Sequence, residues 1–81
     1  MTQKRNICEI AKEIKQDWKK VYFGAVPYLD AMMSLRTIDD LFYQDSAESI
    51  ITYFLANAST YRGENAKRLK LELKLKLKPK N

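Results

Sequence analysis

Hydrophobic residues recur every three or four positions over residues 6–22, which is the spacing of one face of an α-helix. The repeat comprises Ile7, Ile10, Ala11, Ile14, Trp18 and Val21. Asn6 and Glu9 have the spacing of a capping box at the start of a helix. Gly24 follows the repeat, where a helix end favours a residue with positive φ. The pattern therefore predicts a first helix over residues 6–22.

A second, shorter repeat covers residues 27–35. Pro27 favours the first turn of a helix, because its missing N–H would have no intrahelical acceptor there. Apolar residues occupy most sides of this segment, which is typical of a helix at the centre of a small domain. After a turn through Arg36 and Thr37, we expect a short helical piece over residues 38–43.

The third repeat is the clearest in the chain and predicts a helix over residues 46–58. Its apolar positions are Ala47, Ile50, Ile51, Phe54, Leu55 and Ala58. Asp45 or Ser46 can accept a hydrogen bond from a backbone N–H of the first turn and so cap this helix. Phe54 lies in the middle of the repeat, so we expect its ring in the core.

The last segment, residues 61–78, is compatible with two structures. From Leu69 onward leucines alternate with charged residues, the period-two pattern of a half-buried strand. A helical repeat fits as well: Ala66, Leu69, Leu73 and Leu77. We predict a helix, because Leu, Lys and Glu are good helix formers and no earlier segment offers a strand edge.

A helix over residues 61–78 has a consequence for its surface. Leu71 and Leu75 would project about 180° away from the other leucines, on a face that they share with Arg68. Exposed leucines of this kind indicate a protein that binds a partner or self-associates into a homo-oligomer. Leu71, Leu75 and Arg68 are therefore the candidate partner-binding residues.

Together these elements predict a compact all-α fold of three or four helices. The 81 residues have room for one small domain, which we place at residues 1–78, with a frayed tail at residues 79–81. Hydrophobic residues make up 46% and charged residues 31%, the balance of a globular protein rather than a disordered one. We expect no membrane association, because no stretch approaches the length of a membrane span and residues 1–10 lack the apolar core of a signal peptide.

Charge is distributed unevenly along the chain. Residues 37–61 contain four acidic side chains and no basic one, whereas residues 62–81 contain eight basic and two acidic ones. Lysines form a ridge on each of the outer predicted helices: Lys12, Lys15 and Lys19 on the first, and Lys67, Lys70, Lys74 and Lys78 on the last. If these helices lie side by side, the ridges can merge into a patch that attracts phosphate backbones. Solvation of a small protein explains the same lysines without a ligand.

Side chains with catalytic or metal-binding chemistry are few. The chain contains no histidine, which excludes His-containing triads and the commonest metal ligand. Cys8, as the single cysteine, cannot form an internal disulfide, and it suits a reducing compartment as a small packed side chain. Asp39, Asp40 and Asp45 lack EF-hand spacing and are better explained as cap and loop carboxylates than as a cation site. We expect no enzyme activity, no metal and no cofactor.

Three stretches carry a family resemblance: IKQDWKKVYF at residues 14–23, GAVPYLDAM at residues 24–32 and DSAESIITYFLANASTYRGENAKRLKLELK at residues 45–74. Together they resemble a family of short, uncharacterised proteins carried by bacteriophages and prophages. The alternating Leu/Lys tail beyond Leu73 departs from the family pattern. The resemblance brings no activity and no catalytic residues. It implies the bacterial cytoplasm during phage replication or lysogeny.

Two classes of function are compatible with these observations. The first is a small non-enzymatic phage-type accessory protein that binds a host or phage protein, with inhibition of a bacterial defence system as one such role. The second is a nucleic-acid-binding protein that uses the lysine ridges. We favour the first, because no predicted helix has the mix of Arg, Gln, Asn and Ser expected of a recognition helix.

Overall fold

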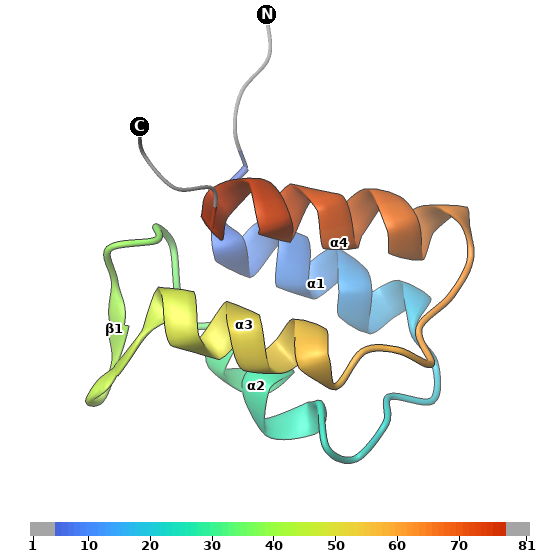
Figure 1. Ribbon diagram of the computed structural model, residues 1–81, viewed down its shortest axis with the longest axis horizontal. Coiled ribbons are helices and arrows are strands. Elements are labelled where there is room, and N and C mark those ends of the chain that lie inside the picture. Colours follow the sequence, from blue (N-terminus) through green and yellow to red (C-terminus); the bar gives the residue numbers. More distant parts are fainter. Residues whose placement is uncertain (1–4, 78–81) are drawn as a thin grey trace, which may run out of the picture.

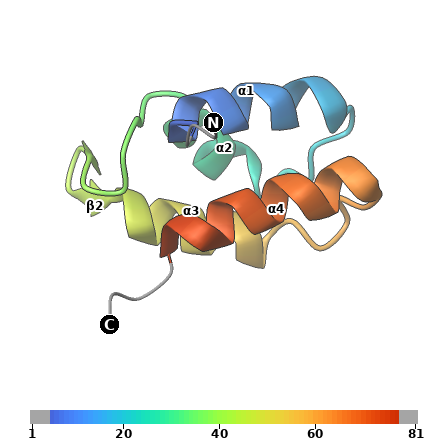
Figure 2. The same ribbon diagram turned by 90° about the horizontal axis from the view of Figure 1, so that it is seen from above.

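Each apolar repeat of the sequence forms a helix in the computed structural model, which describes residues 5–77 (Figure 1). The elements in chain order are α1 (Ile7–Asp17), α2 (Val26–Met32), β1 (Leu41–Phe42), β2 (Asp45–Ser46), α3 (Ala47–Ala56) and α4 (Glu64–Leu77). α4 runs antiparallel beside α1 (Figures 1 and 2). α3 contacts α4 and α2, and α2 contacts α1, so the helices close into a ring around one core. The predicted helical architecture is confirmed, with a small hairpin added.

The core is built from the apolar faces of the four helices. Its largest fully buried side chains are Ile7, Ile10, Ile14, Met32, Leu35, Ile51, Phe54, Leu69 and Leu73. Trp18 stacks on Tyr61 with ring centroids 4.8 Å apart, and it meets the ring of Phe54 edge-on at 6.2 Å. The Tyr61 hydroxyl donates a hydrogen bond to Asp17 Oδ2 at 2.7 Å, which satisfies the polar end of a buried ring. This aromatic cluster ties the end of α1 to the connection between α3 and α4.

The predicted capping residues of α1 and α3 are confirmed. Glu9 accepts a hydrogen bond from the backbone N–H of Asn6 at 3.0 Å, as part of the capping box that begins α1. Ser46 Oγ accepts from the backbone N–H of Ser49 at 3.1 Å and caps α3. Pro27 lies in the first turn of α2, which begins one residue earlier than predicted.

The helices end earlier than their repeats predict. The repeat of α1 continues to Val21, but the helix stops at Asp17 and Trp18 has an extended backbone with φ −91° and ψ 92°. The indole of Trp18 is fixed in the core against Tyr61, and the chain leaves the helix at that point to reach α2. α2 likewise ends at Met32 and α3 at Ala56, within their predicted ranges.

The two glycines meet different requirements. Gly24 does not have the positive φ predicted for it. A Cβ at that position would lie 2.6 Å from Cε2 of Tyr22 and 2.9 Å from Oδ1 of Asn57, so the requirement there is close approach. Gly63 has φ +113°, with nothing within 4 Å of where its Cβ would lie, so the requirement is conformational. Its carbonyl accepts from the N–H of Lys67 at 3.0 Å as α4 begins.

The prediction of a helical piece over residues 38–43 is wrong. β1 and β2 instead pair antiparallel as a hairpin, with Leu41 opposite Ser46. Tyr43 occupies the turn with φ +57°, a region that is costly for a residue other than glycine. Leu41 and Tyr43 project into solvent, with exposed fractions of 66% and 86%.

Asp40 sets the path of the chain into the hairpin. Its Oδ2 accepts hydrogen bonds from the backbone N–H groups of Arg36 at 2.8 Å and Thr37 at 3.2 Å. Its backbone carbonyl accepts from the N–H of Ala47 at 3.0 Å, which holds the hairpin against the start of α3. Such local bonds from an aspartate compete with helix formation, and here they replace it.

The last segment forms a helix, α4, as predicted, and not the alternative strand. It begins at Glu64, three residues later than predicted, and continues to Leu77. The residues that it buries are Ala66, Leu69 and Leu73, as the helical repeat predicts. Lys78 and the tail at residues 79–81 lie outside the described residues.

Candidate partner-binding surface

The outer side of α4 carries the two leucines that the sequence singles out. Leu71 and Leu75 are 56% and 58% exposed. They lie two positions beyond the buried Leu69 and Leu73, which is about 200° around the helix. Arg68 lies on the same side, one turn before Leu71. The predicted exposure is confirmed, and Arg68, Leu71 and Leu75 are called the α4 strip below.

An ion-pair network joins the α4 strip to α1. Arg68 Nη2 lies 2.5 Å from Glu13 Oε2, and Arg5 Nη1 lies 2.7 Å from the other oxygen of Glu13. Arg5 also pairs with Glu72 on α4. The hydrogen bond from Arg68, followed by that from Arg5, holds the pKa of Glu13 below its ordinary value. Arg68 is therefore fixed in direction, while its side chain stays 49% exposed.

The lysines of α1 do not merge with those of α4, although the two helices lie side by side as a merger would require. The facing flanks of the helices are occupied by the ion-pair network through Glu13. Lys12 and Lys15 lie about 100° and 160° from Glu13 around α1, on the flank away from α4. Lys19 is not on the helix, since it follows Trp18, where α1 has ended. The lysines thus form separate groups.

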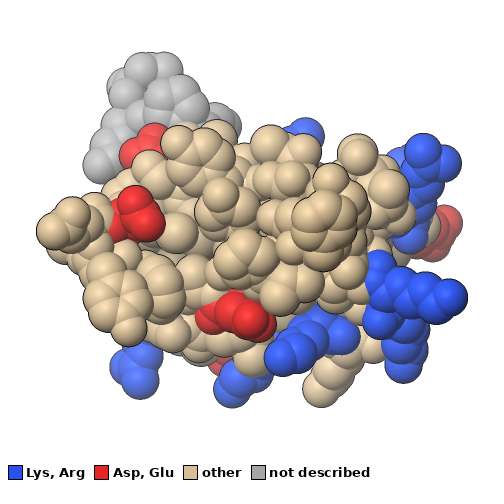
Figure 3. Space-filling view, turned by 90° about the horizontal axis from the view of Figure 1, so that it is seen from below, with Lys and Arg blue, Asp and Glu red and all other residues tan. Residues whose placement is uncertain are grey.

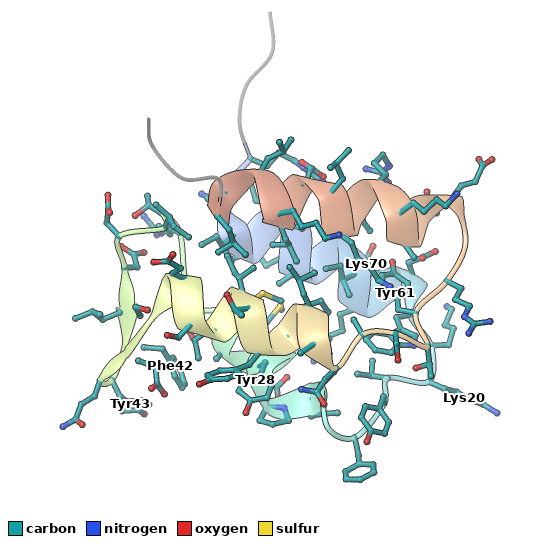
Figure 4. All side chains as sticks on the ribbon, in the orientation of Figure 1. Lys20, Tyr28, Phe42, Tyr43, Tyr61 and Lys70 are labelled. Carbon is teal, nitrogen blue, oxygen red and sulfur yellow. The ribbon has the colours of Figure 1, made fainter. Side chains whose placement is uncertain are left out.

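The basic group on α4 is dense. Lys70 Nζ lies 5.7 Å from the ring centroid of Tyr61, and the two side chains are adjacent in Figure 4. Burial, with the nearby charges of Lys74 and Arg62, lowers the pKa of Lys70. Lys67, Lys70, Lys74 and Arg62 are called the basic flank below. Lys78, the last member of the predicted ridge, lies outside the described residues.

A further surface with exposed aromatic side chains lies on the side opposite α4. In Figure 3 this face carries basic side chains mainly at its margins. Phe23, which precedes α2 in the chain, is 78% exposed, and the rings of Tyr28 on α2 and Tyr53 on α3 lie 5.5 Å apart. Tyr43 is also exposed, at the hairpin (Figure 4). In the sequence, the exposed Tyr43 belongs to the apolar run Leu41–Tyr43, which lies between Asp40 and Asp45. Because the pattern does not predict a hairpin there, it does not show on which surface this run lies.

The remaining sequence candidates do not gather into a site. Cys8 is a free, partly buried thiol whose Sγ lies 3.5 Å from Oδ1 of Asn6. Among residues 5–77, no three His, Cys, Asp or Glu side chains lie close enough together to hold a metal ion. Asp40 serves the loop, as predicted, and its hydrogen bonds from the backbone of Arg36 and Thr37 lower its pKa. None of the helices in this range has the length and hydropathy to cross a bilayer.

Known proteins provide no further guide to the family. No family model matches this chain. Neither a curated protein nor a solved structure matches it. The resemblance to phage and prophage proteins therefore stays a prediction.

Proposed function

We propose that this protein is a small, non-enzymatic, phage-type accessory protein that acts by binding a host or phage protein. The observation that supports the proposal is the α4 strip, in which two leucines one turn apart each leave more than half of their surface in water. Full burial of a leucine side chain contributes about 1.5–3 kcal/mol. Covering the exposed parts of Leu71 and Leu75 therefore contributes about 2 kcal/mol to a complex.

Arg68 gives the α4 strip a polar margin. Its guanidinium group pairs with Glu13, and about half of the surface of the side chain stays accessible to a partner. Apolar residues beside a fixed arginine match the composition of interface centres, where Arg is enriched and other charged residues are depleted. The α4 strip thus combines apolar surface that a partner can bury with a charged group that can fix the orientation of the partner.

The phage context rests on the resemblance alone. The lack of histidine supports binding rather than catalysis as the mode of action. Within that context we propose a bacterial cytoplasmic location, and inhibition of a host defence system as one outcome of binding. Binding through the α4 strip is the part of the proposal that can be tested first.

The test is affinity capture from phage-infected bacterial lysate with the wild type and two double variants. Leu71→Lys with Leu75→Lys removes the apolar part of the α4 strip. Phe23→Lys with Leu41→Lys is the matched control, because it adds the same charge and also removes two exposed apolar side chains. The proposal expects a protein that the wild type and the control retain and the strip variant does not. Retention of the same proteins by all three overturns it.

A second candidate function is nucleic-acid binding through the basic flank. It is favoured by the spacing of Lys67, Lys70 and Lys74, which follow one another at three and four residues along one side of α4. Anisotropy of labelled duplex DNA and single-stranded RNA at about 50 and 200 mM salt tests it, because phosphate contacts weaken steeply over that range. Binding that is lost in Lys67→Gln/Lys74→Gln but kept in Lys12→Gln/Lys15→Gln would make this the leading function.

A further inference from the structure

A hollow of about 520 Å³ opens beside Leu75, between the start of α1, the segment after α2 and the last turns of α4. Its wall is fixed, because the backbone N–H of Ile7 donates to the carbonyl of Arg36 at 2.9 Å. Ile38 and Leu75 line it with apolar surface above the buried Ile10, and Arg5, Arg36 and Lys76 line it with positive charge. A volume of this size lies within the range that protein ligand sites show.

The acidic residue that lines the hollow does not neutralise all of its positive charge. Arg5 pairs with Glu72, the acidic residue of the lining. Arg36 and Lys76 form no ion pair with any of residues 5–77. Asp40 lies close to Arg36 but binds its backbone N–H rather than its guanidinium group. Three basic side chains and one acidic side chain line the hollow, so the lining has a net charge of +2 beside an apolar wall, and the nearby carboxylate of Asp40 offsets part of the charge of Arg36.

We propose that this hollow receives an acidic, amphipathic segment of the partner protein. An aliphatic side chain of that segment enters between Ile10, Ile38 and Leu75, and its carboxylates pair with Arg36 and Lys76. Leu75 belongs both to the hollow and to the α4 strip, so one segment can cover both. The inference rests on the proposed function and specifies the chemistry of the partner.

The geometry of α4 supports a peptide rather than a small molecule. Leu71 lies one helical turn, about 5–6 Å, from Leu75 and outside the hollow, so a ligand confined to the hollow leaves it exposed. Covering Leu71 and Leu75 alone buries too little apolar area for a micromolar complex. Filling the hollow adds apolar area and charge-assisted hydrogen bonds, which together supply more of the needed free energy.

The charges of this chain distinguish the possible occupants. Residues 1–4 and 78–81 carry Lys4, Lys78 and Lys80 and no acidic side chain, so they do not complement the hollow. The acidic stretch of a second copy, residues 37–61 with the exposed Leu41 and Tyr43, is the competing occupant. In that case the protein would form dimers or larger assemblies that Arg36→Glu dissociates, and this result in sedimentation would overturn the proposal of a different partner.

The probe is a fluorescein-labelled helical peptide with leucine at each turn of one face and glutamate at the flanking positions. Binding to the full chain is measured by anisotropy, and the site is mapped by amide shifts of the ¹⁵N-labelled protein. Arg36→Glu with Lys76→Glu should weaken binding by about tenfold or more, because it removes two ion pairs and adds repulsion. The matched control is Lys12→Glu with Lys15→Glu, which changes net charge equally on the far flank of α1.

The proposal expects amide shifts around Arg36–Ile38 and Leu75–Lys76 and little effect of the control variant. Equal weakening by both variants, or shifts confined to the basic flank, overturns it. Arg36→Gln with Lys76→Gln provides a milder pair, to be used if circular dichroism shows that the reversed pair does not fold. If the hollow fails but Leu71→Lys with Leu75→Lys still abolishes capture from lysate, the proposed function stands and only the acidic segment is refuted.

Discussion

The hydroxyl of Tyr61 offers a sharp test of the aromatic cluster that joins α1 to the start of α4. The ring is 3% exposed, and its hydroxyl donates to the carboxylate of Asp17 at 2.7 Å. Tyr61→Phe removes this bond and keeps the stacking on Trp18 and the contact with Lys70. A buried hydrogen bond to a charged group contributes about 1.5–3 kcal/mol, and because Asp17 is exposed to solvent this one should contribute less, about 1–1.5 kcal/mol. For a domain of this size the Tm should fall by about 5–10 °C.

The same substitution has a pH signature. Burial, followed by the bond to Asp17, raises the pKa of Tyr61 above its ordinary value. Since the folded-state pKa is the higher one, the contribution of Tyr61 is complete below about pH 10, where the unfolded chain begins to ionise, and is lost as pH rises further. The free energies of unfolding of wild type and Tyr61→Phe should therefore converge above about pH 10.

Thermal and urea unfolding, followed by circular dichroism at about pH 7 and 10.5, measure both effects. Tyr53→Phe is the control, because that ring is 53% exposed and its hydroxyl makes no hydrogen bond within residues 5–77. A Tm that drops equally in both variants, or a difference from wild type that widens at alkaline pH, would refute the reasoning.

Three further outcomes are expected. Phe54→Ala should cost about 3–5 kcal/mol in urea unfolding, because the ring is fully buried, and a loss below about 1 kcal/mol would place it outside the core. Glu13→Gln should destabilise the protein at neutral pH. Because the folded-state pKa of Glu13 is lowered, its contribution to stability is present above about pH 4.3 and is lost as pH falls. The unfolding curves of wild type and Glu13→Gln should therefore approach each other in acid. Gly63→Ala should cost about 1–2 kcal/mol through backbone conformation alone, since no atom lies within 4 Å of the new Cβ, and an unchanged Tm would contradict that reading.

Only part of the hollow can be predicted from the sequence. The position of Leu75 opposite the buried leucines predicts that it is exposed, and the structure confirms this. Arg36 and Lys76 were not singled out, because they are 40 residues apart in the chain and each looks like an ordinary solvated cation. They meet at one hollow because α4 returns antiparallel to α1, whose first residue is bonded to the carbonyl of Arg36.

The sequence by itself determined the first three helices, the capping residues of α1 and α3 and the buried faces of those two helices, and it left the last segment compatible with either a helix or a strand. These properties depend on neighbours within one or two turns, so the spacing of apolar residues and the hydrogen-bonding groups of Asn6 and Ser46 suffice to specify them. Tertiary structure decided where α1 ends, because the indole of Trp18 packs on Tyr61, a residue distant in the sequence that lies between α3 and α4. It also separated the lysines of α1 from those of α4, because Glu13 and Arg68 occupy the flanks between them. The spacing of apolar residues thus determines on which face of a helix a residue lies, whereas the packing of the helices determines which residues that face contacts.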